Sequence, residues 1–270
     1  MTPRLVHRLW DFVFQVRPAE FARVQVLLAF LTTVTAFWTL GSTVGDTLFL
    51  SHLGVEGSLR YLPWLFIGTA VVTVLVTAAF DLVQTRVPRV ALLLGLFVLL
   101  AISILLFRQI VSPGRPWVYL ALAIWIEACG ILGITLFFST AGDYFTSRDA
   151  RRLYGYINGG MALGTLLGGY GVGPLVRAFG THNLLYVCAA LLLACAGWIV
   201  LLRVLARPVS VKAAAEPEPP LKAILGSGYF RRVGIMVLLT GVLFVLVSYQ
   251  FKLKAGRELR EEELAVFFGK

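Results

Sequence analysis

The chain has 270 residues, of which 59% are hydrophobic and only 14% charged, and its formal net charge is +10. That hydrophobic share lies far above the range of soluble domains, so the composition excludes an ordinary water-soluble protein. The apolar residues also occur in blocks long enough to cross a bilayer, which takes about 20 residues each. The sequence therefore predicts a polytopic membrane protein whose main partner is the lipid bilayer.

Residues 1–23 are basic and are predicted to form a short amphipathic segment on the cytoplasmic face of the membrane. Seven continuously apolar blocks follow. Each is too long for the ten-residue alternating strand of a membrane barrel, so each is predicted to be a spanning helix. The predicted spans cover residues 24–49, 62–80, 90–111, 117–141, 154–176, 184–205 and 233–251.

One long connector separates the sixth predicted span from the seventh. Residues 206–232 contain the run KAAAEPEPPLKA, whose proline, alanine and glutamate residues are typical of a cytoplasmic linker. Six spans, a long internal loop and a further span match the layout of a twelve-span carrier built from two six-helix halves. We therefore expect residues 24–205 to form an all-α N-terminal bundle and residues 233–270 to begin an incomplete C-terminal bundle. A missing C-terminal half or a second copy of the chain would complete it.

The basic residues predict how the chain lies across the membrane. Fifteen of the 24 Lys and Arg residues fall on the side of the amino terminus, four on the opposite side, and five after the last span. Because cytoplasmic loops carry the excess of positive charge, the amino terminus is predicted to be cytoplasmic in a cell inner (plasma) membrane. Since these residues are scattered over short connectors, they do not indicate a nucleic-acid-binding face.

Glu127 is an acid set within the apolar fourth span. It lies ten residues after Trp117, which is about 15 Å along a helix and close to the middle of a hydrocarbon layer of about 30 Å. A carboxylate at that depth costs on the order of 3 kcal/mol, so we expect it to face a cavity or a partner, or to carry a proton. Glu127 is therefore a candidate proton or substrate site. The alternative is a protonated carboxyl that only fixes helix packing.

Polar residues recur at steps of three and four along the first span, which places them on one face of a helix. They are Thr32, Thr35, Thr39, Ser42 and Asp46. With Glu127 this stripe is predicted to line an aqueous path, with Asp46 near its outer end. The alternative is that each hydroxyl bonds the preceding helical turn and eases helix packing.

Gly160, Gly164 and Gly168 recur four residues apart in the fifth span. Small residues at this spacing form a smooth strip on which another helix packs closely. The pattern predicts a helix-packing seam, and a sliding role during transport is a further hypothesis.

The connector between spans four and five is rich in charge. Asp143 and Asp149 alternate there with Arg148, Arg151 and Arg152. Ion pairs among them are a candidate cytoplasmic gate. The topology rule alone would also place arginines at this position.

No pattern of catalysis or metal binding is found in the sequence. His, Cys and acidic residues lack metal-ligand spacing, and no nucleophile–His–Asp grouping or phosphate-binding glycine loop is present. The sequence therefore predicts no enzyme activity, no metal and no cofactor.

The stretch from Glu127 to Gly169 resembles the ATP:ADP antiporter family of bacteria and plastids, a branch of the major facilitator fold. The resemblance rests on Glu127, the aromatic pair Phe137 and Phe138, the turn RDARRLYG, and the Gly160–Gly168 seam. It implies that Glu127 belongs to a translocation site and that the substrate is an organic anion such as a nucleotide. One position departs from the family, because Gly45 stands before Asp46 and Thr47 where the family carries a lysine.

We therefore expect a transporter of the major facilitator type, similar to nucleotide (ATP/ADP) carriers. It would exchange an organic anion, or take it up with proton coupling, by alternating access. The competing hypothesis is a non-transporting membrane anchor or regulatory module, or a truncated remnant of such a carrier.

Overall fold

The computed structural model describes residues 20–84, 87–111, 116–145, 147–205 and 228–258. Every element among them is helical: α2 (Phe21–Gln84), α3 (Arg89–Ile110), α4 (Pro116–Gly142), α5 (Ser147–Phe179), the short 3-10 helix η1 (Thr181–Asn183), α6 (Leu184–Leu205) and α8 (Gly228–Glu258). Six segments are long and apolar enough to cross a membrane. The predicted helical membrane bundle is thus confirmed, and the protein is a multi-pass helical membrane protein.

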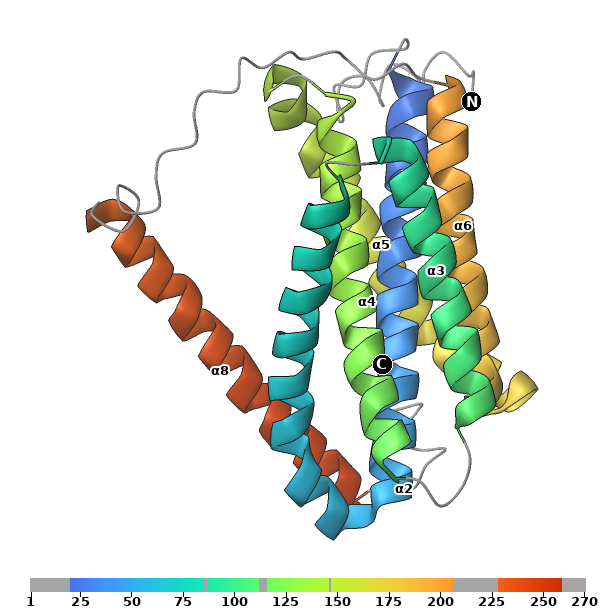
Figure 1. Cartoon of the computed structure of the whole chain (residues 1–270), viewed down its shortest axis with the longest axis vertical. Coiled ribbons are helices and arrows are strands. Elements are labelled where there is room, and N and C mark those ends of the chain that lie inside the picture. Colours follow the sequence, from blue (N-terminus) through green and yellow to red (C-terminus); the bar gives the residue numbers. More distant parts are fainter. Residues whose placement is uncertain (1–19, 85–86, 112–115, 146, 206–227, 259–270) are drawn as a thin grey trace, which may run out of the picture.

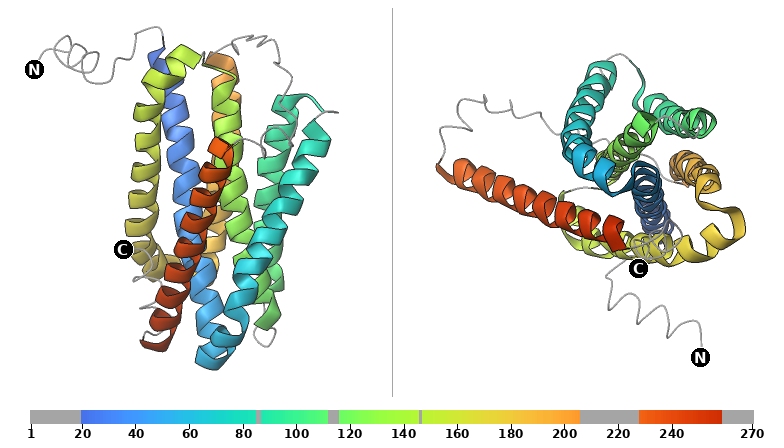
Figure 2. Two further views of the ribbon diagram at one scale, coloured as in Figure 1. Left: turned by 90° about the vertical axis from the view of Figure 1, so that its left-hand side faces the viewer. Right: turned by 90° about the horizontal axis from the view of Figure 1, so that it is seen from below.

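The first two predicted spans belong to a single helical run. The apolar segments Phe21–Leu53 and Arg60–Gln84 both lie in α2, so residues 50–61, predicted as a connector, are helical instead. Figures 1 and 2 show the chain reversing direction at this end of the bundle, so that the second segment returns beside the first. Gly54 and Gly57 lie at the reversal, where small residues let a helix axis bend sharply. We call residues 21–53 the first segment and residues 60–84 the return segment.

Helix α5 contains the predicted fifth span, although its composition is less apolar than that of the other helices. Its mean hydropathy is too low for it to be one of the six apolar segments named above, because glycines and polar residues replace large apolar side chains along it. It is nevertheless 33 residues long, about 50 Å at 1.5 Å per residue, and it lies against α2 in the bundle. Gly180, with a φ of 78°, follows its last residue.

The first segment of α2 is the centre of the bundle. It packs against α4, α5 and α6, while α3 covers α6 and part of α4. Phe30 illustrates the packing, because its ring meets the rings of Phe97 on α3 and Phe137 on α4 edge to face, at centroid distances of 5.7 and 5.3 Å. In lipid such close packing, rather than exclusion from water, holds helices together.

Helix α8 extends beyond the predicted seventh span at both ends. Helix α8 begins at Gly228 and ends at Glu258, so it takes in the last five residues of the predicted linker and continues past the predicted end of the seventh span. Backbone hydrogen bonding continues a helix beyond its apolar stretch, which hydropathy alone does not register. Residues 1–19 of the predicted amphipathic segment and residues 206–227 of the linker lie outside the described residues.

Candidate functional site: a charged cavity between α2, α4 and α8

A cavity of about 680 Å³ lies between both segments of α2, the middle of α4 and the last turns of α8. Its walls are mostly apolar, with a few polar and charged side chains among them. Its polar, charged and aromatic lining residues are Trp38, Ser42, Asp46, Phe66, Thr69, Thr73, Glu127, Phe244, Ser248 and Lys252. Among the described residues, no three His, Cys, Asp or Glu side chains come close enough together to hold a metal ion.

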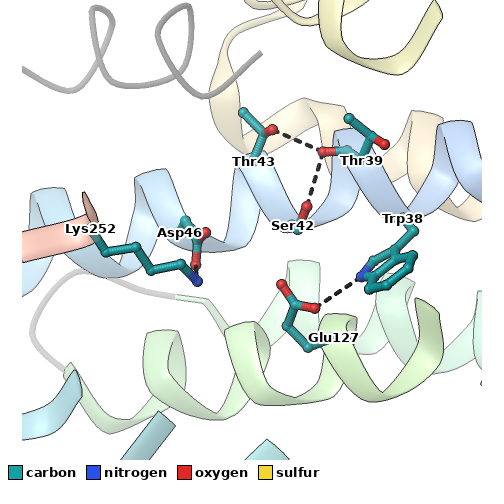
Figure 3. Close-up of polar contacts among 7 residues, drawn as sticks. All are labelled: Trp38, Thr39, Ser42, Thr43, Asp46, Glu127 and Lys252. Carbon is teal, nitrogen blue, oxygen red and sulfur yellow. Dashed lines mark hydrogen bonds and ion pairs between the residues drawn. The ribbon is translucent and has the colours of Figure 1, made fainter. Parts of the chain in front are cut away.

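Glu127 points into the bundle and toward this cavity rather than toward lipid (Figure 3). The indole Nε1 of Trp38 donates a hydrogen bond of 2.9 Å to one of its carboxyl oxygens, Oε2. Gly130, one turn further along α4, makes room for this indole, because a Cβ at that position would overlap the Trp38 ring. The second carboxyl oxygen of Glu127 is turned away from the indole.

Asp46 forms an ion pair that joins the first segment of α2 to α8. The Lys252 Nζ donates to the Asp46 Oδ1 at 2.7 Å, and the two side chains are only 13% and 9% exposed. The same ammonium group lies 5.6 Å from the centroid of the Phe66 ring on the return segment. Lys252 therefore ties three segments of the chain together at one end of the cavity.

The sequence analysis missed Lys252, because it stands one residue beyond the seventh predicted span and was grouped with the tail. The position of Lys252 in the helical repeat could have indicated that it faces the bundle. Val245, Ser248 and Lys252 recur at steps of three and four, so they share one face of α8, and that face lines the cavity. A charged residue on the polar face of a span is the signal to look for.

The predicted polar stripe divides into two parts. Ser42 and Asp46 line the cavity, whereas Thr35 and Thr39 are not among its lining residues. The Thr35 hydroxyl donates to the Leu31 carbonyl at 2.9 Å and is buried against α5. Thr35 and Thr39 therefore lie outside the lining of this cavity, and their place on a path with Glu127 stays a prediction. The stripe does follow one helix face, but α5 covers that face beside the glycines.

The glycine seam packs directly on the first segment of α2. A Cβ at Gly160 would lie 2.8 Å from the Leu28 carbonyl oxygen, and one at Gly168 would lie 2.9 Å from that of Ala36. At Gly164 it would overlap both the side chain of Thr35 and the backbone of α2. The predicted close packing is therefore present. A sliding role for the seam stays a prediction.

The predicted cytoplasmic gate is only partly described. Arg152 pairs with Glu20 at 2.5 Å and lies 3.7 Å from Asp149. Glu20, at the start of α2, was not predicted as a partner. Asp143 lies just after α4, and the side chains of Arg148 and Arg151 are outside the described part of the structure. The observed ion pair thus links the start of α5 to the start of α2.

We expect that removing either member of the Asp46–Lys252 pair destabilises the protein more than removing both. Asp46→Asn or Lys252→Gln leaves one buried charge without its partner, which costs about 3–5 kcal/mol. The double variant leaves no uncompensated charge and should recover most of this loss. Thermal unfolding of the detergent-solubilised protein measures the effect. Additive losses in the double variant would mean that the pair makes no net contribution.

Comparisons with models of known protein families, with curated proteins and with solved structures found no match to this chain.

Proposed function

We propose that this protein is a membrane transporter of the major facilitator type, which moves a small molecule through the cavity beside Glu127 by alternating access. In this proposal residues 24–205 are the N-terminal bundle of a carrier and α8 is the first span of its second half. Glu127 binds a proton or orients the substrate. The resemblance noted for the stretch from Glu127 to Gly169 favours the same class of protein.

The observation that carries the proposal is the position of a carboxylate within a cavity, far from either end of its helix. Glu127 is ten residues from Trp117 and fifteen from Gly142, the ends of the apolar part of α4. Intramembrane acids of this kind typically lie on substrate or proton pathways, because their cost must be offset by a polar surrounding.

The Asp46–Lys252 pair supports a carrier in a second way. It joins the six-helix part of the chain to α8, which follows the predicted linker. Alternating access requires two bundles that rock against each other, and ion pairs across their interface stabilise one of the two states. The pair lies where such an interface would be in the proposed carrier.

A cysteine-accessibility experiment tests alternating access without knowledge of the substrate. Ser42→Cys on α2 and Ser248→Cys on α8 place thiols in the cavity lining on two different helices. The native cysteines Cys129, Cys188 and Cys195 are buried, so their background labelling should be low. In a carrier, each new thiol should react with a membrane-impermeant maleimide both in right-side-out and in inside-out vesicles, because the cavity opens to each side in turn.

Leu75→Cys is the matched control. Leu75 belongs to the return segment of α2 but is 63% exposed on the outside of the bundle, away from the cavity. It should stay unlabelled by the impermeant reagent in both vesicle types. Labelling of Ser42→Cys and Ser248→Cys from one side only would contradict transport and favour the non-transporting membrane module.

The resemblance implies a nucleotide or another organic anion as the substrate. Among the described lining residues, Lys252 is the cationic side chain, and it is already paired with Asp46. A polyphosphate needs several cations in a site from which water is excluded. The described walls of the cavity therefore support transport more directly than they support a nucleotide as the cargo.

A further inference from the structure

The charges on the described cavity walls do not balance. Asp46 and Glu127 contribute two carboxylates and Lys252 contributes one ammonium group. Lys252 forms its hydrogen bond with Asp46, so that pair is neutral as a unit. Glu127 keeps an uncompensated negative charge whenever it is ionised, and the hydrogen bond to its Oε2 comes from the neutral indole of Trp38.

The polar and aromatic groups that line the cavity with Glu127 come from three segments of the chain. The first segment of α2 contributes Trp38 and Asp46, α8 contributes Lys252, and the return segment contributes Phe66, Thr69 and Thr73. Of these, Asp46 and Lys252 carry charge, and both lie close enough to act electrostatically on Glu127. Their effects on Glu127 have opposite signs and offset each other, so an ionised Glu127 needs a further positive charge to neutralise it.

The remaining walls are aromatic and weakly polar. Trp38, Phe66 and Phe244 provide ring surfaces, and the Phe66 ring already lies near the ammonium group of Lys252. The hydroxyls of Thr69 and Thr73 lie one helical turn apart, and neither has a hydrogen-bond partner among the described residues. Aromatic faces beside a single carboxylate are the composition that binds organic cations, because both attract positive charge.

We infer that the cavity binds an organic monocation with an aromatic or apolar body, in exchange for the proton of Glu127. This inference rests on the proposed transport function and names the substrate class of the same site. With Glu127 protonated, the described walls are neutral. When the cation binds, the carboxyl proton leaves through the cavity to water, and the carboxylate pairs with the cation. Each of the two states is therefore neutral, and no buried charge is left without a partner.

An organic anion meets a less favourable cavity. To pair with it, Lys252 would have to leave Asp46, whose carboxylate would then face the ligand beside the carboxyl group of Glu127. Like charges close together in a poorly solvated cavity repel strongly, so the cation is the ligand that these walls favour.

Binding of two ions of equal size and opposite charge tests the inference. Equilibrium dialysis of the purified full chain in detergent measures binding of radiolabelled tetraphenylphosphonium and of tetraphenylborate. We expect saturable binding of the phosphonium only, with one proton released for each cation bound. Its affinity should fall as the pH is lowered, approaching tenfold per pH unit where Glu127 is mostly protonated, because proton and cation compete for one carboxylate.

Three variants identify the group that binds. Glu127→Gln should weaken phosphonium binding at least tenfold and remove its pH dependence, while a glutamine oxygen can still accept the Trp38 hydrogen bond. Lys252→Gln, measured on the fraction that stays monodisperse, should tighten phosphonium binding, because it leaves Asp46 unpaired. Asp81→Asn is the matched control, since Asp81 is an exposed acid outside the cavity and its removal should change nothing.

Three results would overturn the inference: saturable tetraphenylborate binding that Lys252→Gln removes, phosphonium binding that Glu127→Gln leaves intact, or no saturable binding of either ion. Each is separable from a failure of the transport proposal. If the cavity cysteines are labelled from both sides and any of these results is obtained, the cation inference is contradicted while the transport proposal stands. If they are labelled from one side only, the transport proposal itself is contradicted.

Discussion

Glu127→Gln is expected to abolish proton-coupled uptake or exchange, leaving no more flux than empty liposomes show. The substitution keeps the shape of the side chain and its contact with Trp38 but removes the only titratable carboxyl on the α4 wall of the cavity. Without a group that gains and loses a proton during the cycle, a proton gradient has nothing to act on. The measurement is uptake of radiolabelled ATP and of tetraphenylphosphonium into proteoliposomes, with an imposed pH gradient and the membrane potential clamped at zero.

The control is Asp81→Asn, which removes an exposed acid near the end of α2 and should transport as the unmodified protein does. Using both labelled ions keeps this test independent of the substrate class. Full activity of Glu127→Gln with an unchanged pH dependence would remove Glu127 from the mechanism, whichever ion is carried.

Gly164→Leu is expected to prevent correct assembly of the bundle. A side chain at this position has no space, because even a Cβ would overlap Thr35 and approach the backbone of Thr32 and Ala36. To admit it, α5 would have to move away from α2 along the whole seam. Overpacking of this kind costs at least about 3 kcal/mol, since the obstacle is backbone rather than a flexible side chain. The yield of monodisperse protein and its thermal unfolding in detergent measure the loss.

Gly159→Leu is the matched control on the same helix. Gly159 is exposed, and a Cβ there would meet nothing within 4 Å. A leucine at this position should therefore face lipid and leave folding intact, and it also removes the cost of a glycine within a helix. Equal behaviour of the two variants would show that the α2–α5 contact does not depend on the absence of side chains.

Local sequence patterns were enough to place most of the helices. The apolar blocks predict α3, α4 and α6 almost to the residue, because the length of a spanning helix follows from the thickness of the bilayer. The glycine spacing likewise predicts close packing at Gly160, Gly164 and Gly168. The connector at residues 50–61 was predicted, but its helical backbone was not, since hydropathy marks where a chain leaves the apolar layer and does not register whether its backbone stays helical there.

The candidate site depended on contacts that sequence spacing does not contain. Helical periodicity places Thr35, Thr39, Ser42 and Asp46 on one face of α2, yet it does not say which neighbour covers that face at each depth. In the structure, α5 covers Thr35 and Thr39, and the cavity lies beside Ser42 and Asp46. Only two of the four residues therefore line this cavity, although all four share one helix face.

The sequence by itself determined that this is a helical membrane protein and that Glu127 lies within its fourth apolar block. Polar backbone groups in lipid must be hydrogen-bonded within the protein, which requires helices, and an acid at that depth needs a cavity, a partner or a proton. Only the tertiary structure decided which charges meet. Lys252 is 206 residues from Asp46 along the chain, and the ion pair exists because α8 packs against both segments of α2. A charge acts over a few ångströms in space, so its partner is set by the packing of helices and not by separation along the chain.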